Sequence, residues 1–156
     1  MSLASVWRFL HLFFSFAFVS TLVVAQWNSR AASATSDWGQ RAVLFNVIHL
    51  STRGMGLGTL VLLGVFGHLT AATLGYRMGT DPWLIWVTGT WLAALGVMAF
   101  VARPAAGRLA ALSSAAAKGG DAEDFDATFK RWRLANGTMS LLYLALLALM
   151  VFRWRP

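Results

Sequence analysis

Two histidines that lie inside long apolar segments have the greatest capacity for chemistry in this sequence. His11 follows Trp7 by about one helical turn, and His68 lies about two turns before Gly75. Ionisable side chains inside membrane-spanning segments mark functional sites by default. If the two segments are antiparallel neighbours, the imidazoles differ in depth by about one turn and can face each other across a gap. A b-type haem held by two axial nitrogens needs that arrangement.

The residues around the two histidines suit such a haem. Small residues share a helical face with His68 and leave room for a macrocycle. Arginines flank the same ends of the apolar segments, where guanidinium groups can pair with haem propionates. The sequence therefore predicts a haem b site at His11 and His68, with a role in electron transfer or redox sensing. The other residues of the predicted site are Arg8, Gly64, Ala72, Arg77 and Arg153.

Two other interpretations of the histidine pair stay open. A neutral histidine can form a hydrogen bond between membrane helices and bind no ligand. A copper ion could be bound by the two imidazoles and a methionine, for which Met78 is the nearest candidate in the adjoining loop. His49, near Arg53 at the opposite end of its segment, is expected to be solvated or interfacial. The chain has no nucleotide-binding, nucleophile or zinc-protease motif, so the sequence does not favour an enzyme.

The composition is that of a membrane protein. The chain is 58% hydrophobic and 12% charged, whereas soluble domains carry about 25% charged residues. It has no cysteine, which excludes disulfides, thiolate metal sites and covalent c-type haem. The net charge of +7 comes from basic residues beside apolar segments, with no nucleic-acid recognition motif. The predicted partner is therefore a lipid bilayer and not a nucleic acid.

Four apolar segments are long enough to cross a bilayer, which takes about 20 residues each. They predict an all-α fold, a four-helix transmembrane bundle with helical extensions on the cytoplasmic side, as a single domain over residues 1–156. The first segment could be taken for a signal peptide, but it exceeds a typical h-region, so we expect it to be retained. The predicted spans cover about residues 4–26, 54–75, 83–101 and 134–152.

Local signals predict where several helices begin. Asp37 and Gln40 have the spacing of a capping box, so the second helix is expected to begin near Trp38. Asp81 followed by Pro82 predicts the start of the third helix, with a capping residue and proline at the first helical position. Both signals precede apolar segments and support the predicted spans.

The longest polar stretch separates the third span from the fourth. Residues 105–118 are expected to continue the helix, residues 119–120 to form a turn, and Asp121 to begin a new helix. Aromatic residues recur there at helical spacing, which predicts an amphipathic stem leading into the fourth span. They are Phe125, Phe129 and Trp132.

The distribution of lysine and arginine predicts the orientation. Nine of these residues lie in the loops after the first and third spans, and four lie at the opposite side. The positive-inside rule then places the two longer loops in the cytoplasm and both termini on the outer side of the membrane. Trp27 and Trp132 are expected in the inner aromatic belt, and Trp7, Trp83, Trp86 and Trp154, the last of which lies outside the residues described below, in the outer one.

The chain resembles an uncharacterised bacterial family of predicted integral membrane proteins, distantly similar to the copper-resistance D membrane proteins. The resemblance covers most of the chain and implies a four-helix bundle in a bacterial inner membrane, whose outer side is the periplasm. It leaves function open, so an accessory or scaffold subunit of a larger membrane complex, or a homo-oligomer, stands beside the haem hypothesis. The residues that carry the resemblance are His11-Leu12, Gly67-His68-Leu69-Thr70-Ala71-Ala72, Leu74-Gly75-Tyr76, Asp81-Pro82-Trp83-Leu84, Arg103-Pro104 and the ending from Leu149 to Pro156.

Overall fold

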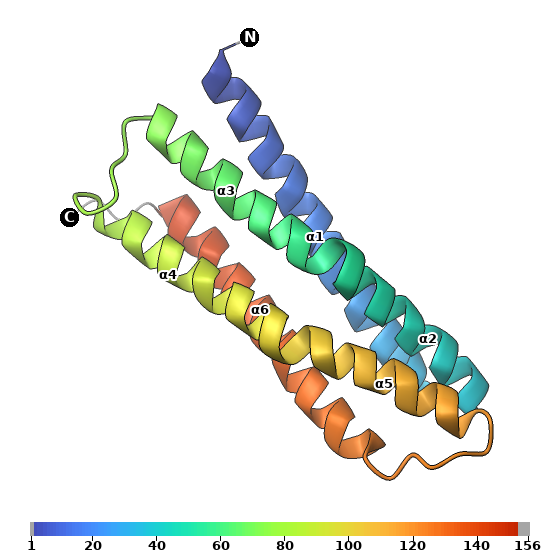
Figure 1. Cartoon of the computed structure of the whole chain (residues 1–156). Helices are drawn as coiled ribbons and strands as arrows, with labels where there is room; N and C mark the ends of the chain where they lie inside the picture. Colours follow the sequence, from blue (N-terminus) through green and yellow to red (C-terminus); the bar gives the residue numbers. More distant parts are fainter. Residues whose placement is uncertain (1, 153–156) are drawn as a thin grey trace.

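The chain folds into four long helical rods, seen in a computed structural model that describes residues 2–152 (Figure 1). Two rods contain a π-helical turn between two α-helices, so each is continuous. No strand occurs in the described residues, which confirms the predicted all-α four-helix bundle. The elements are α1 (Leu3–Ala34), α2 (Trp38–Ser51), η1 (Thr52–Gly56), α3 (Leu57–Thr73), α4 (Pro82–Val97), η2 (Met98–Ala102), α5 (Arg103–Ala116) and α6 (Phe125–Phe152).

The predicted helix starts are confirmed where the sequence signals were local. The Asp37 side chain accepts a hydrogen bond from the Gly39 backbone N–H at 2.7 Å and caps α2. Pro82 occupies the first turn of α4 directly after Asp81. The α5 helix ends in a turn in which Gly119 adopts a φ of +83°, a conformation open to glycine at little cost. Short-range steric and capping preferences therefore set these boundaries.

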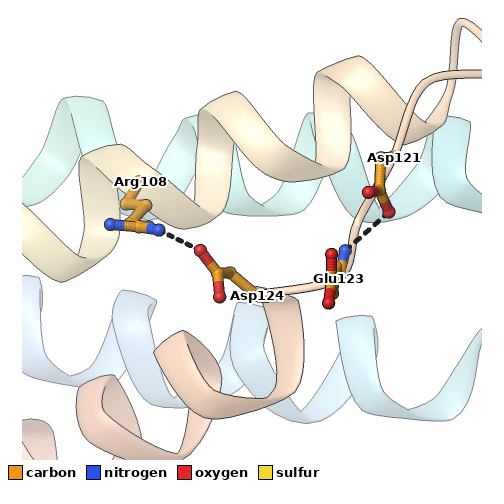
Figure 2. A network of polar contacts seen from close by, with 4 residues as sticks. All are labelled: Arg108, Asp121, Glu123 and Asp124. Carbon is orange, nitrogen blue, oxygen red and sulfur yellow. Dashed lines mark hydrogen bonds and ion pairs between the residues drawn. The ribbon is translucent and has the colours of Figure 1, made fainter.

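The connection from α5 to α6 is longer than predicted. The Asp121 side chain accepts a hydrogen bond from the Glu123 backbone N–H at 2.9 Å, but residues 123–124 form a turn and do not begin a helix. Arg108 of α5 forms an ion pair with Asp124 (Figure 2). The α6 helix therefore begins at Phe125, and the predicted start at Asp121 is wrong.

Each rod is long and apolar enough to cross a membrane, and the chain is a multi-pass membrane protein. The rod Trp38–Thr73 has 36 residues, or about 54 Å, against a hydrocarbon core of about 30 Å. The rods therefore extend beyond the bilayer. Helix α1 continues to Ala34, well past the predicted end at residue 26, because no proline or glycine interrupts it.

The two ends of the bundle differ in what they contain. We call the end with Ser2, residues 74–81 and Phe152 the terminal end, and the end with residues 35–37 and 117–124 the loop end. The second rod has no charged residue from Gly54 to its end at Thr73, a stretch of 20 residues or about 30 Å, and the next charged residue is Arg77 in the loop. The hydrocarbon core can therefore lie between these two levels, with α2 and α5 largely outside it on the loop end.

Two clusters of buried side chains hold the rods together. The first lies at the loop end, where Phe45 of α2, Leu109 of α5 and Trp132 of α6 meet. The second lies nearer the middle and includes Phe18, Leu60, Met98 and Met139. The amphipathic stem at the start of α6 is thus confirmed as a packing element. Trp132 is only 2% exposed and belongs to this core, so its predicted place in an aromatic belt facing lipid headgroups is wrong.

The rods pack closely at the loop end and diverge at the terminal end. Helix α2 packs along α5, whereas α3 and α4 make few contacts, and Figure 1 shows them separating toward the terminal end. Helix α1 packs on α3, and α4 packs on α6. The terminal half of the bundle is therefore two helix pairs with space between them, and the predicted site lies in that half.

Candidate functional site

A cavity of about 310 Å³ lies between the two helix pairs, and both membrane-embedded histidines line it. We call it the histidine cavity. Its volume is at the lower end of the range of small-molecule sites, about 300–1,000 Å³. Its wall is mostly apolar. The lining residues are Arg8, His11, Leu12, Leu63, Gly64, Gly67, His68, Thr70, Ala71, Leu74, Tyr76, Trp83, Leu84, Val87, Trp91, Leu146, Leu147, Met150 and Val151.

His11 of α1 is fixed against the backbone of α3. Its Nδ1 lies 2.7 Å from the carbonyl oxygen of Leu63. Its ring also packs on Gly67, where an added Cβ would approach Cε1 and Nδ1 of the imidazole to 3.0 Å. The absence of a side chain at Gly67 thus allows the close approach that brings His11 within hydrogen-bond distance of α3.

His68 is fixed on its own helix and contacts α4. Its Nδ1 lies 2.7 Å from the Gly64 carbonyl oxygen, and its Nε2 lies 2.8 Å from the Thr88 hydroxyl. The ring also packs against the indole of Trp91, with the ring centroids 5.5 Å apart. These contacts connect α3 to α4 in the part of the bundle where the two helices otherwise diverge.

The hydrogen bonds define the proton positions on both neutral rings. A carbonyl oxygen only accepts, so Nδ1 of His11 and Nδ1 of His68 must each carry the proton. Each Nε2 then carries a lone pair, which is the form of imidazole that ligates metals, and the lone pair of His68 faces the Thr88 hydroxyl. The two acceptors, Leu63 and Gly64, are consecutive residues of α3, so the two rings are held at one level of the bundle.

Two further polar groups line the histidine cavity. Arg8 contributes a cation from the first turns of α1. Trp83 of α4 lines the cavity too, and its Nε1–H is buried without a hydrogen-bond partner in the described structure. A buried donor without an acceptor is uncommon and costly. An acceptor group on a ligand in the cavity would satisfy it.

The structure separates the other residues of the predicted site. Gly64 lines the cavity, but the space above it is filled, because an added Cβ would lie 2.1 Å from Cε2 of Trp91. Ala72 is exposed and is not part of the lining. Arg77 is exposed in the loop after α3, where its backbone N–H donates to Asp81 at 2.7 Å. Arg153 lies outside the described residues.

Several lining residues were not predicted from the sequence. Trp83 and Trp91 come from α4, and Met150 comes from α6. Thr88 of α4 was not predicted either; it contacts His68 without being part of the lining. Apolar and aromatic side chains of this kind occur all along the predicted spans, so only the helix arrangement distinguishes them. His49 lies in a different pocket toward the loop end. No group of three or more His, Cys, Asp or Glu side chains that could hold a metal ion occurs within residues 2–152.

No known protein family, curated protein or solved structure matches this chain. The resemblance to membrane proteins distantly similar to the copper-resistance D proteins therefore stays a prediction. The function must be argued from the histidine cavity itself.

Proposed function

We propose that this chain holds one b-type haem in the histidine cavity, ligated by His11 and His68, for electron transfer or redox sensing. The observation that carries the proposal is the pair of hydrogen bonds from the two Nδ1 atoms to the carbonyls of Leu63 and Gly64. They leave an Nε2 lone pair on each of two imidazoles that line one apolar cavity. Histidines that ligate metals almost always donate their second ring N–H to a carbonyl, a carboxylate or water.

The remaining polar groups of the cavity fit the same ligand. A haem presents an apolar macrocycle with two carboxylates at one edge. The apolar wall suits the macrocycle, while the Arg8 guanidinium and the unpartnered Trp83 N–H suit a carboxylate. When bound, the haem would supply a one-electron redox centre, and the protein would supply ligands and an apolar surrounding that sets its potential.

His68 must change one contact to act as a ligand. Its Nε2 is paired with the Thr88 hydroxyl. That hydroxyl also lies 2.7 Å from the Leu84 carbonyl oxygen and 3.7 Å from Sδ of Met78. It can therefore direct its single proton to either of these acceptors and release Nε2 without becoming unsatisfied.

The orientation is part of the proposal. The loop end carries most of the lysines and arginines, so it faces the cytoplasm in a bacterial inner membrane, with both termini on the periplasmic side. His68 lies five residues, or about 7.5 Å along the helix, from the end of α3 at Thr73. The haem would then lie within the periplasmic leaflet, within reach of electron carriers at that surface.

A spectroscopic experiment tests the proposal. The protein is purified after expression with added haem precursor, and reduced-minus-oxidised spectra are recorded. The wild type and His49→Ala are expected to show a sharp α band and a Soret band, and His11→Ala and His68→Ala to lose them. Addition of imidazole to His11→Gly should restore part of the signal, because free imidazole replaces a lost ligand. A wild-type protein without a chromophore overturns the proposal, and stoichiometric co-purification with another membrane protein would then support an accessory subunit.

Copper is a second candidate, favoured by one observation. Met150 lines the histidine cavity together with His11 and His68, so two imidazoles and a thioether surround the same space. Thioether and imidazole ligands together suit Cu(I). Metal analysis of protein purified with copper present distinguishes the candidates. One copper per chain in the wild type, lost in Met150→Leu and in His68→Ala, supports copper binding. A haem spectrum that is unchanged in Met150→Leu supports haem binding.

A further inference from the structure

A second pocket, of about 430 Å³, opens beside the π-helical turns of the second and third rods. We call it the arginine pocket. Its lining combines one imidazole and two guanidinium groups with small side chains, and it includes no carboxylate. The lining residues are His49, Arg53, Ala99, Arg103, Pro104 and Gly107. This composition gives a concave, positively charged surface shared between two rods.

The two arginines of this pocket have no partner of their own. The guanidinium groups of Arg53 and Arg103 form no hydrogen bond or ion pair with any of residues 2–152, and both residues are exposed. Other arginines of the chain differ. Arg108 is paired with Asp124 (Figure 2), and Arg41 donates to the Thr35 carbonyl and lies over Trp38. Two unpaired cations on one pocket attract an anion that can reach both.

His49 supplies a hydrogen-bond donor to the same pocket. Its Nδ1 is buried without a partner, packed against Gly107 so closely that an added Cβ there would lie 3.3 Å from it. With no acceptor at Nδ1, the proton of the neutral ring is better placed on Nε2. The Nε2 atom has no hydrogen bond in the described structure, so it is the donor left for a ligand.

The backbone of both rods departs from the α-helix at this level. Arg53 lies within η1 (Thr52–Gly56), and Arg103 directly follows η2 (Met98–Ala102). One side chain connects the two turns, since an added Cβ at Gly56 would lie 3.4 Å from Cε of Met98. Short π-helical turns inside α-helices occur frequently at functional sites. Two of them side by side bring both arginines to one pocket.

The level of this pocket matches a membrane surface. No charged residue lies between Arg53 and Arg77, nor between Asp81 and Arg103. Each stretch spans at least the hydrocarbon thickness of about 30 Å. Arg53 and Arg103 therefore lie where the hydrocarbon ends and phospholipid phosphate groups begin. Basic pockets between membrane helices at this depth are suited to phosphate-bearing headgroups.

We propose that the arginine pocket binds a phosphate oxyanion, with the guanidinium groups of Arg53 and Arg103 and the Nε2–H of His49 as donors. Guanidinium groups bind phosphate through paired, charge-assisted hydrogen bonds. Anionic phospholipid headgroups and free inorganic phosphate share this chemistry, and the experiment separates them. The proposal does not depend on a cofactor in the histidine cavity.

The test uses the full-length protein in nanodiscs of phosphatidylcholine. One arm titrates short-chain phosphatidylglycerol and the other titrates inorganic phosphate, with binding followed by native mass spectrometry and by the rise in unfolding temperature. Saturable binding in either arm identifies the source. The double variant Arg53→Gln with Arg103→Gln should weaken it by about tenfold or more, because charged hydrogen bonds are lost. His49→Gln should weaken it by a smaller factor.

A matched variant controls for bulk charge. Arg30→Gln with Arg131→Gln removes the same charge from exposed residues that lie outside the pocket. It should change binding by less than about twofold, since distant exposed charges are screened. Equal losses in both double variants, or no saturable binding of either compound by a wild type that unfolds cooperatively, would overturn the proposal. Unfolding temperatures without added ligand confirm that each variant is folded.

Discussion

At the residue scale, the two histidines of the cavity differ in what Nε2 contacts. No hydrogen bond joins Nε2 of His11 to another described residue, whereas Nε2 of His68 is paired with Thr88. A ligand that approaches the cavity therefore finds one imidazole ready and one that must exchange a hydroxyl partner. Loss of the hydrogen bond between Thr88 and His68 is therefore expected to increase the affinity for haem.

Thr88→Val is expected to tighten haem binding by about two- to tenfold, because the Thr88 hydroxyl no longer competes for Nε2 of His68. A net hydrogen bond of this kind is worth about 0.5–1.5 kcal/mol. Haem titration of the apo-protein in detergent measures the change. Thr90→Val is the matched control, since Thr90 bonds only to the Trp86 carbonyl on the exposed side of the same helix. Weaker binding in Thr88→Val would instead make Thr88 a positioning residue for His68.

Gly64 gives a second prediction at this scale. A Cβ at this residue would lie 2.1 Å from Cε2 of Trp91, whose Nε1–H donates to the Leu60 carbonyl at 2.8 Å. Gly64→Ala should therefore displace the indole and lower the free energy of unfolding by about 1–3 kcal/mol. Gly58→Ala, on the same helix with open space around it, should be neutral or stabilising by up to about 1 kcal/mol. Unfolding in detergent, followed by tryptophan fluorescence, compares the two.

At the element scale, the loop end is held by a core of aromatic side chains that the membrane does not provide. Trp38 and Phe45 of α2 contact Phe125 of α6, and Trp132 lies beneath them. The extensions of the rods therefore form a packed layer of their own, whose stability depends on burial and can be measured separately from that of the spans.

Trp132→Ala is expected to cost about 3–5 kcal/mol of unfolding free energy, since it empties the volume of a side chain that is 2% exposed. Trp27→Ala is the control, because Trp27 is 74% exposed and its loss leaves no internal cavity. Its effect in detergent should stay within about 0.5 kcal/mol. Equal effects of the two substitutions would contradict a packed core at the loop end.

At this scale, features that are set by interactions within one helical turn could be predicted from the sequence, and features that are set by longer-range contacts could not. Helix starts at Trp38 and Pro82 were predictable, because the Asp37 cap and the proline at the first helical position act within one turn. The predicted capping role of the Asp81 side chain is wrong, since it accepts from the Arg77 backbone N–H instead. The apolar spans were predictable from length. The late start of α6 at Phe125 was not, because Asp121 is a common capping residue, whereas in the structure a turn at residues 123–124 separates it from the helix. The two π-helical turns have no sequence signal that we can identify.

The candidate site was predictable only in its histidines. His11 and His68 stand out in the sequence because ionisable residues are rare in apolar segments. Their acceptors are backbone carbonyls, which every residue has, so no pattern of residue types could indicate Leu63. The filling of the space at Gly64 by Trp91 depends on how α3 packs on α4. Both features arise from tertiary packing.

At the scale of the whole molecule, the bundle has a closed half and an open half. Rods two and three are packed together at the loop end and diverge at the terminal end, where α3 and α4 make few contacts (Figure 1). The histidine cavity and the arginine pocket consequently lie at different levels of one molecule. Which level faces which compartment depends on the orientation, so a topology experiment bears on both proposals.

Fusion reporters are expected to place the termini in the periplasm and the loop end in the cytoplasm. Alkaline phosphatase, which folds only after export, should be active when fused to the C-terminus, and green fluorescent protein at the same position should be dark. The reverse should hold when each reporter is inserted at the turn around Gly119, which is exposed and joins α5 to α6. The physical reason is the excess of lysine and arginine at the loop end, which resists translocation. Fluorescence from the C-terminal fusion would show that the orientation is the opposite one, with the histidine cavity in the cytoplasmic leaflet. The arginine pocket would then face periplasmic headgroups, although its three donors would be unchanged.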